Sequence, residues 1–291
     1  MAHSTIAPDL GASYEHCRRL HRRFDPTYYW ATRRLPDEVR PAVHALYAFV
    51  RTADEIVDGP GRPADPRARR IALDSCEAEL ARARTDGGSR EPVVAALVDA
   101  ADRHDLPLGE LDRYFDSMRT DCGTVRIETW SELELYMLGS AGSVGSILAV
   151  LLDVPLEQRD SFVRLALAFQ LTNFIRDVRQ DWELDRVYLP AEDLERFGVS
   201  LAEIDRREPS AGFRHLLALQ VGRARALFDD SSPAAQAVSP GVRRGILMAR
   251  SVYGAVLDRA ERLNFDVLRH RTELPPWRLA EAVAQGLRAR A

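Results

Sequence analysis

Apolar residues recur at steps of three and four along almost the whole chain, which is the period of an α-helix. Between Glu38 and Asp58 the pattern is carried by Val39, Val43, Leu46, Tyr47, Val50, Ala53 and Val57. Such spacing predicts one apolar face of an amphipathic helix, which Gly59-Pro60 ends. Similar patterns cover about 11–34, 67–85, 91–105, 108–120, 130–153, 156–184, 201–207, 211–229, 239–268 and 276–290. No window alternates as a strand does, so we expect an all-α fold.

The breaks between these segments are single prolines and glycines, not long linkers. No Gly/Ser-rich stretch or shift in composition divides the 291 residues. We therefore expect residues 1–291 to form a single domain, built as a large helical bundle. The segments around 141–174 are apolar on both faces, as is typical of helices at the centre of such a bundle.

All 40 basic residues are arginine, because the sequence contains no lysine. This composition excludes lysine Schiff-base and pyridoxal-phosphate enzymes, and P-loops that end in Gly-Lys-Ser/Thr. The formal net charge is −4, without a basic excess, so we expect no nucleic-acid partner. No feature of the sequence assigns an oligomeric state.

The cellular context follows from the cysteines and the apolar stretches. Three cysteines without a Cys-x-x-Cys pair, and an N-terminus without a signal-peptide pattern, favour a soluble protein in a reducing cytoplasm. The most apolar stretch, about 141–154, is too short to span a bilayer. Peripheral membrane contact stays open as a hypothesis, with the arginine-rich run from Arg18 to Arg23 as its candidate.

Two pairs of aspartates stand out, Asp54 with Asp58 and Asp177 with Asp181. A spacing of four places both carboxylates of a pair on one helix face, about 6 Å apart. One such pair is usually a solvated face, but these two lie in largely apolar helices, where an uncompensated carboxylate is costly. Oxygen ligands suit Mg²⁺, which commonly joins carboxylates to substrate phosphates. The two pairs therefore predict a Mg²⁺–diphosphate site.

Polar residues near these pairs add candidate ligands. Arg51 and Arg176 lie close to Asp54 and Asp177, and an arginine can clamp phosphate oxygens with two nitrogens. The plainer interpretation of each arginine is an intrahelical ion pair with the neighbouring aspartate, and for Arg179 we favour that interpretation. Gln170 and Asn173 precede Asp177 by seven and four residues, on the same helix face. Their amides can bind a substrate, or they can simply line a helix crossing.

The surrounding sequence resembles the squalene/phytoene synthase family. Residues 46–58 are similar to the first signature of that family, and 170–181 followed by Asp185-Arg186-Val187-Tyr188-Leu189-Pro190 are similar to the second. Tyr136 with the small residues of 140–145 resembles the family's tyrosine and helix break, and Tyr253 with 264–271 resembles its C-terminal helix. The resemblance covers about residues 13–280.

The resemblance implies an isoprenoid synthase fold with a central cavity and a Mg²⁺-dependent prenyltransferase, with Mn²⁺ as the alternative ion. It implies that two prenyl diphosphates join head to head through a cyclopropyl diphosphate. The metal ligands would be Asp54, Asp58, Asn173, Asp177 and Asp181. Tyr47 and Tyr136 would face the carbocation. The substrate side would comprise Arg51, Thr27, Tyr28, Gln170, Arg176, Arg186, Tyr188, Tyr253 and Arg271.

Two departures from the family pattern raise alternatives. Phe24-Asp25-Pro26-Thr27-Tyr28 stands where the family shows a stretch of the type His-Ser-Lys-Ser-Phe, and His270 takes one arginine position. We favour condensation of two geranylgeranyl diphosphates to phytoene. The alternatives are a squalene-type synthase acting on farnesyl diphosphate, a terpene cyclase that ionises one diphosphate, and a non-enzymatic assembly factor. A reductive squalene synthase would also need NADPH, and no Gly-x-Gly-x-x-Gly fingerprint is present.

Overall fold

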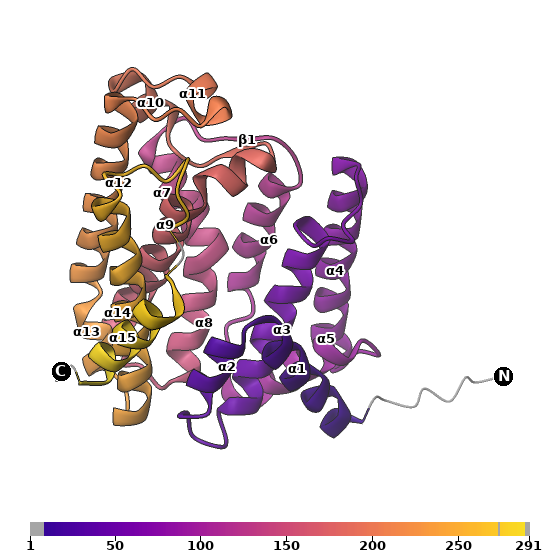
Figure 1. Ribbon diagram of the computed structural model, residues 1–291. Helices are drawn as coiled ribbons and strands as arrows, with labels where there is room; N and C mark the ends of the chain where they lie inside the picture. The colour runs from indigo at the N-terminus through magenta and orange to yellow at the C-terminus, as the bar shows by residue number, and fades with distance from the viewer. Residues whose placement is uncertain (1–8, 273, 289–291) are drawn as a thin grey trace. The chain divides into compact units, whose positions relative to one another are not determined.

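A computed structural model of the chain describes residues 9–272 and 274–288, without the side chains of residues 27 and 31 (Figure 1). The structure is 75% helical with almost no strand, which confirms the predicted all-α class. The described residues divide into two compact units. The first comprises the residues up to Cys122 together with Ile147–Asp153, and the second comprises Gly123–Ser146 and the residues from Val154 onward. That residues 1–291 form a single domain stays a prediction.

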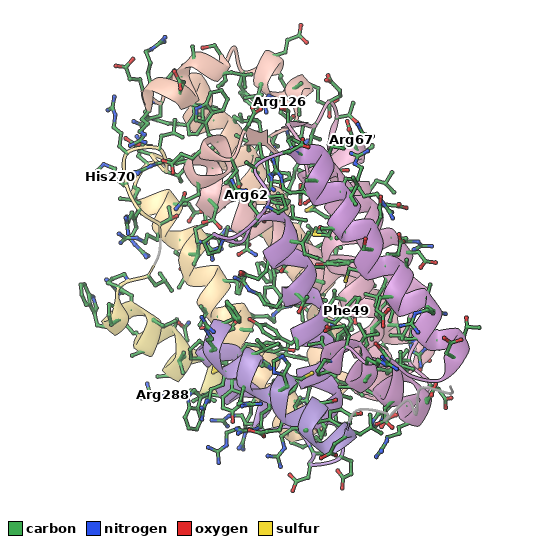
Figure 2. The ribbon with its side chains drawn as sticks, turned by 90° about the vertical axis from the view of Figure 1, so that its right-hand side faces the viewer. Phe49, Arg62, Arg67, Arg126, His270 and Arg288 are labelled. Atoms are coloured by element: carbon green, nitrogen blue, oxygen red, sulfur yellow. The ribbon has the colours of Figure 1, made fainter. Side chains whose placement is uncertain are left out.

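The first unit is built around α3, whose apolar face is buried. Its helices are α1 (Leu10–Phe24), α2 (Pro26–Thr32), α3 (Arg40–Val57), α4 (Pro66–Asp86), α5 (Pro92–His104) and α6 (Glu110–Asp121). Helix α3 packs against α1, α4, α5 and α6. Val43, Leu46, Ala53 and Val57 are buried, as the three- and four-residue steps predicted. Phe49, which was not part of the predicted stripe, is buried as well (Figure 2). This packing fixes the direction in which the last turn of α3 presents its carboxylates.

The helix predicted over 11–34 is in fact two helices, α1 and α2, broken at Asp25. Pro26 disfavours helical geometry at the residue before it, and Asp25 has φ −138°. The backbone N–H of Tyr28 donates to Asp25 Oδ1 over 2.8 Å, so this carboxylate caps the start of α2. The acidic residue at this departure from the family pattern therefore has a local structural role.

The second unit is built around the long helix α9 (Arg159–Glu183). Its other elements are β1 (Val125–Arg126), α7 (Trp130–Met137), the π-helical turn η1 (Leu138–Gly142), the 3₁₀ turn η2 (Leu156–Gln158), β2 (Arg186–Val187), α10 (Ala191–Arg196), α11 (Leu201–Arg206), α12 (Ala211–Asp230), α13 (Ser232–Gln236), α14 (Pro240–Arg262) and α15 (Pro276–Arg288). Helix α9 packs against α12, α14 and η1. Helix α8 (Ser143–Leu151) begins in the second unit and ends in the first.

Several local elements were not expected from the sequence. Strands β1 and β2 pair in parallel, with Val125 opposite Arg186 and Arg126 opposite Val187, and α10 and α13 are additional short helices. The helix expected over 239–268 ends at Arg262, because Asn264 and Phe265 adopt left-handed φ angles of 52° and 57°. The helix expected over 130–153 contains the π-helical turn at Leu138–Gly142. This turn is the helix break that the small residues around Ser140 suggested.

Gly145 lets α8 approach α9 closely. A Cβ at this position would lie 3.0 Å from the Ala166 Cβ and 3.2 Å from the Phe162 carbonyl oxygen. One stretch of the described chain, Trp130–Leu151, is long and apolar enough to cross a membrane by length and composition. That is weak evidence of a span, because the window is half buried in the structure and core helices of soluble proteins pass the same test.

Candidate active site

The first aspartate pair lies at the end of α3. Asp58 caps the helix, and its backbone N–H donates to the carbonyl of Asp54. The Tyr114 hydroxyl lies 2.8 Å from Asp54 Oδ1 and 3.1 Å from the Val50 carbonyl oxygen. The pKa of the Asp54 carboxyl is raised to about 6, mainly by burial; the Tyr114 hydrogen bond and Arg51 act to lower this pKa, and the nearby Asp58 acts to raise it. The carboxylate therefore lacks sufficient positive charge nearby, which is the situation that a bound cation relieves.

Arg51 pairs with Glu55 on the same helix face, one turn along α3. Its guanidinium also lies over the Phe24 ring, 4.5 Å from the ring centroid. Arg51 thus contacts the end of α1, where this sequence departs from the family pattern. Thr27 lies in α2, but its side chain is outside what the structure describes.

Tyr47 and Tyr28 belong to an aromatic cluster with two buried histidines. The His21 ring stacks on Tyr47 with centroids 3.9 Å apart, and its centroid lies 4.9 Å from that of Tyr28. His21 Nδ1 lies 2.9 Å from His44 Nδ1, and both histidines are buried. Burial lowers the pKa of His21 to about 3 and that of His44 to about 4, so both rings are neutral near pH 7. The sequence analysis missed this pair, although both positions lie on apolar faces of predicted helices.

The second group of candidates forms a stripe on α9. Gln170, Asn173, Asp177 and Asp181 follow one another at steps of three and four, which places them along one side of the helix. All four side chains are partly exposed. Asn173 Oδ1 is buried and accepts no hydrogen bond from the described residues. An amide oxygen that is buried without a donor is a ready ligand for a cation or a substrate group.

Arg176 binds Asp177 with both arms of its guanidinium. Arg176 Nε donates to Asp177 Oδ1 over 2.7 Å, and a terminal nitrogen donates to Oδ2 over 2.6 Å. The Thr272 hydroxyl donates to the Arg176 carbonyl over 3.1 Å and so ties α9 to the segment before α15. Arg179 forms an intrahelical ion pair, as expected, but its partner is Glu183, over 3.3 Å, and not a neighbouring aspartate.

Asp181 shares a small pocket with Arg186 and Tyr188. Phe174 also lines this pocket, and its ring stacks on Tyr188 with centroids 4.0 Å apart and planes 19° apart. The Tyr136 ring lies 5.2 Å from that of Tyr188, and their hydroxyl oxygens are 3.5 Å apart. Tyr136, Phe174 and Tyr188 thus form a three-ring cluster beside a carboxylate and a buried guanidinium. Phe174 was not predicted as a site residue. Its spacing of seven residues from Asp181, which places both on one face of α9, could have indicated it.

A second cavity, of about 140 Å³, lies where α9 meets the segment before α15. Arg176, Arg271 and His270 are among its lining residues, and His270 lies in the loop that joins α14 to α15 (Figure 2). Arg271 therefore stands beside the His270 position at which the family pattern departs. Tyr253 lies elsewhere on α14, where its ring packs against Phe169 with centroids 4.4 Å apart.

Asp185 fixes the backbone that presents Arg186 and Tyr188. Its φ is 61°, a left-handed conformation that side chains rarely adopt. Its carboxylate accepts from Arg126 over 2.6 Å and from the Thr124 hydroxyl, and its carbonyl accepts from the Val125 backbone over 3.1 Å. These bonds join β1 to the end of α9 and leave Arg186 buried.

The donor set of these residues fits a hard divalent cation. Carboxylate oxygens and the amide oxygen of Asn173 are ligands of the type that Mg²⁺ prefers. Within residues 9–272 and 274–288, no three His, Cys, Asp or Glu side chains are gathered closely enough to hold a metal alone. Mg²⁺ needs only one or two carboxylates from a protein when substrate phosphates and water complete its shell.

Comparison with known proteins places the chain among isoprenoid synthase folds. A squalene synthase, HpnC from Alicyclobacillus acidocaldarius, superposes with a TM-score of 0.80 at 30% identity, over 88% of this chain and 95% of that one. A dehydrosqualene synthase superposes with a TM-score of 0.84 over 95% of this chain and 96% of that one. Because the two sequences are only 24% identical, this similarity supports the fold alone.

The sequence comparisons give the family. The family model described as squalene/phytoene synthase matches residues 21–278. A phytoene synthase from Arthrospira platensis is 33% identical over 91% of this chain and 89% of its own length, and one from Thermus thermophilus is 33% identical over 90% and 88%. The chain belongs to the squalene/phytoene synthase family. Members of this family are prenyltransferases, and so is this protein.

Proposed function

We propose that this protein joins two geranylgeranyl diphosphates head to head to form phytoene. The observation that carries the proposal is the similarity to phytoene synthases of two distant bacteria over about nine tenths of the chain. The first allylic cation would alkylate the C2–C3 double bond of the second substrate, and loss of a proton would close a cyclopropane. Loss of the second diphosphate, rearrangement and loss of another proton give a hydrocarbon without any reductant.

We infer that Asp54, Asp58, Asp177, Asp181 and Asn173 hold Mg²⁺ at the diphosphate, with Mn²⁺ as a possible substitute. When bound, Mg²⁺ would neutralise the leaving diphosphate and so favour ionisation. The all-oxygen donor set, the raised pKa of Asp54 and the buried Asn173 Oδ1 support this assignment. In both acid pairs the carboxylates are one helical turn apart, a spacing that suits shared oxygen ligation.

The arginines would receive the diphosphate. Arg176 is held on Asp177 in the structure, and once that carboxylate is neutralised its planar fork can turn to phosphate oxygens. Arg186 is buried beside Asp181, and Arg271 lines the same cavity as Arg176. Arg51 would act near the first acid pair. Gln170, Tyr253, Thr27 and Tyr28 complete the proposed substrate-binding set.

Aromatic rings would stabilise the allylic cation. A ring face attracts positive charge, and the attraction is strongest where water is excluded. Tyr136, which packs at a tilt against Phe174 and Tyr188, offers such faces in the second unit, and Tyr47 offers one in the first. Because His21 stacks on Tyr47 and is neutral, it adds no positive charge that would oppose the cation.

Product analysis tests the proposal. Purified protein is incubated with Mg²⁺ and either geranylgeranyl or farnesyl diphosphate, and extracts are read by mass spectrometry, with Asp54→Ala and Asp177→Ala as controls. A C40 hydrocarbon from geranylgeranyl diphosphate, absent with both variants, is the expected result. A product with the carbon count of one substrate would replace the proposal with a terpene cyclase, and no turnover of either substrate would favour an assembly factor.

A squalene-type synthase is the second candidate, because a solved squalene synthase is 30% identical over 88% of this chain. It predicts a C30 product from farnesyl diphosphate in the same assay, formed in preference to any C40 product. Adding NADPH separates its two forms, because only a reductive synthase would then yield squalene. The cyclase candidate loses part of its motivation, since Asp25 caps α2.

A further inference from the structure

An exposed basic surface lies on α1, on α2 and on the turn that follows α2, a segment that also contains Thr27 and Tyr28. We call it the basic–aromatic face and define it as Arg19, Arg22, Arg23, Trp30, Arg33 and Arg34. The five arginines are exposed, and the Trp30 side chain is 60% exposed. Arg22 and Arg23 follow Arg19 by three and four residues, and Arg33 and Arg34 follow Trp30 in the same way. The members on α1 therefore lie on one side of that helix, whereas Arg33 and Arg34 lie in the turn that follows α2.

The two halves of this face are joined through a single residue. Helix α1 ends at Phe24 and α2 begins at Pro26, so only Asp25 separates them. The Tyr28 backbone N–H binds the Asp25 carboxylate, and the Tyr29 backbone N–H donates to its carbonyl over 2.9 Å. These bonds fix the turn between the helices. The arginines of α1 and the tryptophan of α2 thus belong to one ordered corner of the first unit.

The charge of this corner is opposite in sign to that of the whole chain. Between His16 and Pro36 there are six arginines and one acidic residue, whereas the chain as a whole carries −4; Arg18 is paired with Glu15, just outside this stretch. That acidic residue, Asp25, is half-buried and caps α2. The corner therefore presents a concentrated positive charge that an anionic surface would complement.

Trp30 adds a second chemistry to the charge. The Arg33 guanidinium lies 4.9 Å from the centroid of the Trp30 ring, and both side chains stay exposed. An indole with an apolar body and a polar N–H suits the boundary between lipid headgroups and acyl chains. A neighbouring arginine can reach phosphate while its stem lies along apolar surface.

Helix stabilisation alone does not account for this arrangement. Arg22 and Arg23 lie in the last turn of α1, where positive charge offsets the helix dipole. Arg33 and Arg34 directly follow the end of α2, where the same effect operates on a helix of only seven residues, but Arg19 lies outside the last turn of α1. The dipole gives no reason for an exposed tryptophan.

We propose that the basic–aromatic face docks this protein onto membranes that contain anionic phospholipid. The arginines bind headgroup phosphates, and Trp30 inserts at the headgroup level. Such docking would suit the proposed reaction, because a C40 hydrocarbon leaves an enzyme most readily into a lipid phase. Membrane binding is measured without substrate, so its failure and the failure of the proposed function are distinguishable.

Vesicle sedimentation tests the proposal with matched variants. Large vesicles of phosphatidylcholine alone, or with 30% phosphatidylglycerol, are mixed with wild type, with R22Q/R23Q/R33Q/R34Q or with Trp30→Ala. The control R67Q/R84Q/R90Q/R113Q removes the same charge from exposed arginines elsewhere in the first unit. Trp277→Ala removes a tryptophan that is 70% exposed on α15. Circular dichroism and thermal melts establish that each variant is folded.

We expect wild type to bind the anionic vesicles, and 0.5 M NaCl to weaken that binding. The quadruple face variant should bind at least tenfold more weakly, and Trp30→Ala severalfold more weakly, while both controls bind like wild type. Trp30→Phe should remove the blue shift of tryptophan emission that accompanies binding. Absence of wild-type binding, or equal losses in the face variant and the control, would overturn the proposal. Binding of a single-stranded RNA 20-mer at this face, without vesicle binding, would overturn it in favour of a nucleic-acid surface.

Discussion

At the scale of single residues, the surroundings of the candidate ligands depend on contacts with other helices more than on residues nearby in the sequence. The sequence placed Asp54 and Asp58 on one helix face correctly, because helical geometry fixes that relation. It gave no sign of Tyr114, which comes from α6 and binds Asp54 across sixty positions of sequence. Nor did the sequence indicate that the His21 ring contacts the His44 ring. Contacts between helices depend on packing angles, and these have no local pattern in sequence.

Tyr114→Phe should weaken metal-dependent binding at the first acid pair. The hydroxyl steadies the Asp54 carboxylate over 2.8 Å, and loss of a group that orients a ligand typically costs about tenfold in metal affinity. Titration of a prenyl diphosphate analogue with Mg²⁺ measures the change. Tyr14→Phe is the matched control, since the Tyr14 hydroxyl donates to Asp99 over 2.7 Å outside the candidate site. Equal effects of the two variants would show that Tyr114 acts only on stability.

The buried histidine pair should make the fold sensitive to acid. The pKa values of His21 and His44 are lowered to about 3 and about 4, first by burial; the neighbouring His44 adds to the effect at His21, and Arg18 and Arg40 add to it at His44. In the unfolded chain both would titrate near their usual pKa of about 6.5. The unfolded state therefore binds more protons between those values, and the free energy of unfolding should fall as pH drops from about 6.5 towards 4.

Urea denaturation at pH 7.0, 5.5 and 4.5 measures this slope. The double variant H21L/H44L should show a shallower fall than wild type over that range, because leucine takes up no proton. His215→Leu removes an exposed histidine and should leave the slope unchanged. A double variant as acid-sensitive as wild type would place the sensitivity in carboxylates.

At the scale of elements, strongly periodic helices were predicted and their interruptions were not. Helices α4, α5, α6 and α12 lie within one or two residues of their expected bounds, because apolar periodicity and flanking prolines or glycines mark them. The break at Asp25 was missed because Tyr14, Cys17, Phe24 and Tyr28 keep helical spacing across it, although Pro26 is a sequence signal for such a break. The two-residue strands β1 and β2 are too short for any alternation to show.

The close approach of α8 and α9 makes Gly145 sensitive to size. A Cβ there already lies 3.0 Å from the Ala166 Cβ, so Gly145→Val should force these helices apart and destabilise the fold by about 1–3 kcal/mol. Gly222 lies inside α12 with nothing within 4 Å of its Cβ position. Gly222→Ala should therefore raise stability, by up to about 1 kcal/mol, through helix propensity alone. Urea denaturation compares the two; a neutral Gly145→Val would mean that α8 shifts freely on α9.

At the scale of the whole molecule, composition and the two acid signatures carried the argument furthest. The apolar periodicity led to the all-α class and the signatures to the squalene/phytoene synthase family, both confirmed. The roles of the individual site residues stay predictions. The acid pairs belong to different units of the chain, Asp54 and Asp58 to the first and Asp177 and Asp181 to the second. A reaction that needs both pairs makes activity a property of the entire protein and of neither unit alone.

Ligand-induced stabilisation tests that dependence. Mg²⁺ together with a non-hydrolysable prenyl thiodiphosphate should raise the melting temperature, since a ligand at 100 times its dissociation constant adds about 2.7 kcal/mol to the stability of the folded state. EDTA should abolish the shift. Asp54→Asn in one unit and Asp177→Asn in the other should each remove most of it, because either change takes away a proposed metal ligand.

Asp112→Asn and Asp229→Asn are the matched controls, one exposed aspartate from each unit, and both should keep the full shift. Loss in Asp177→Asn but not in Asp54→Asn would mean that the second unit binds the ligand without the first. The cavity beside Arg176 and Arg271 would then account for binding, and the acid pair of α3 would serve another step. Loss in both variants with an unchanged shift in both controls would show that ligand binding requires both Asp54 and Asp177.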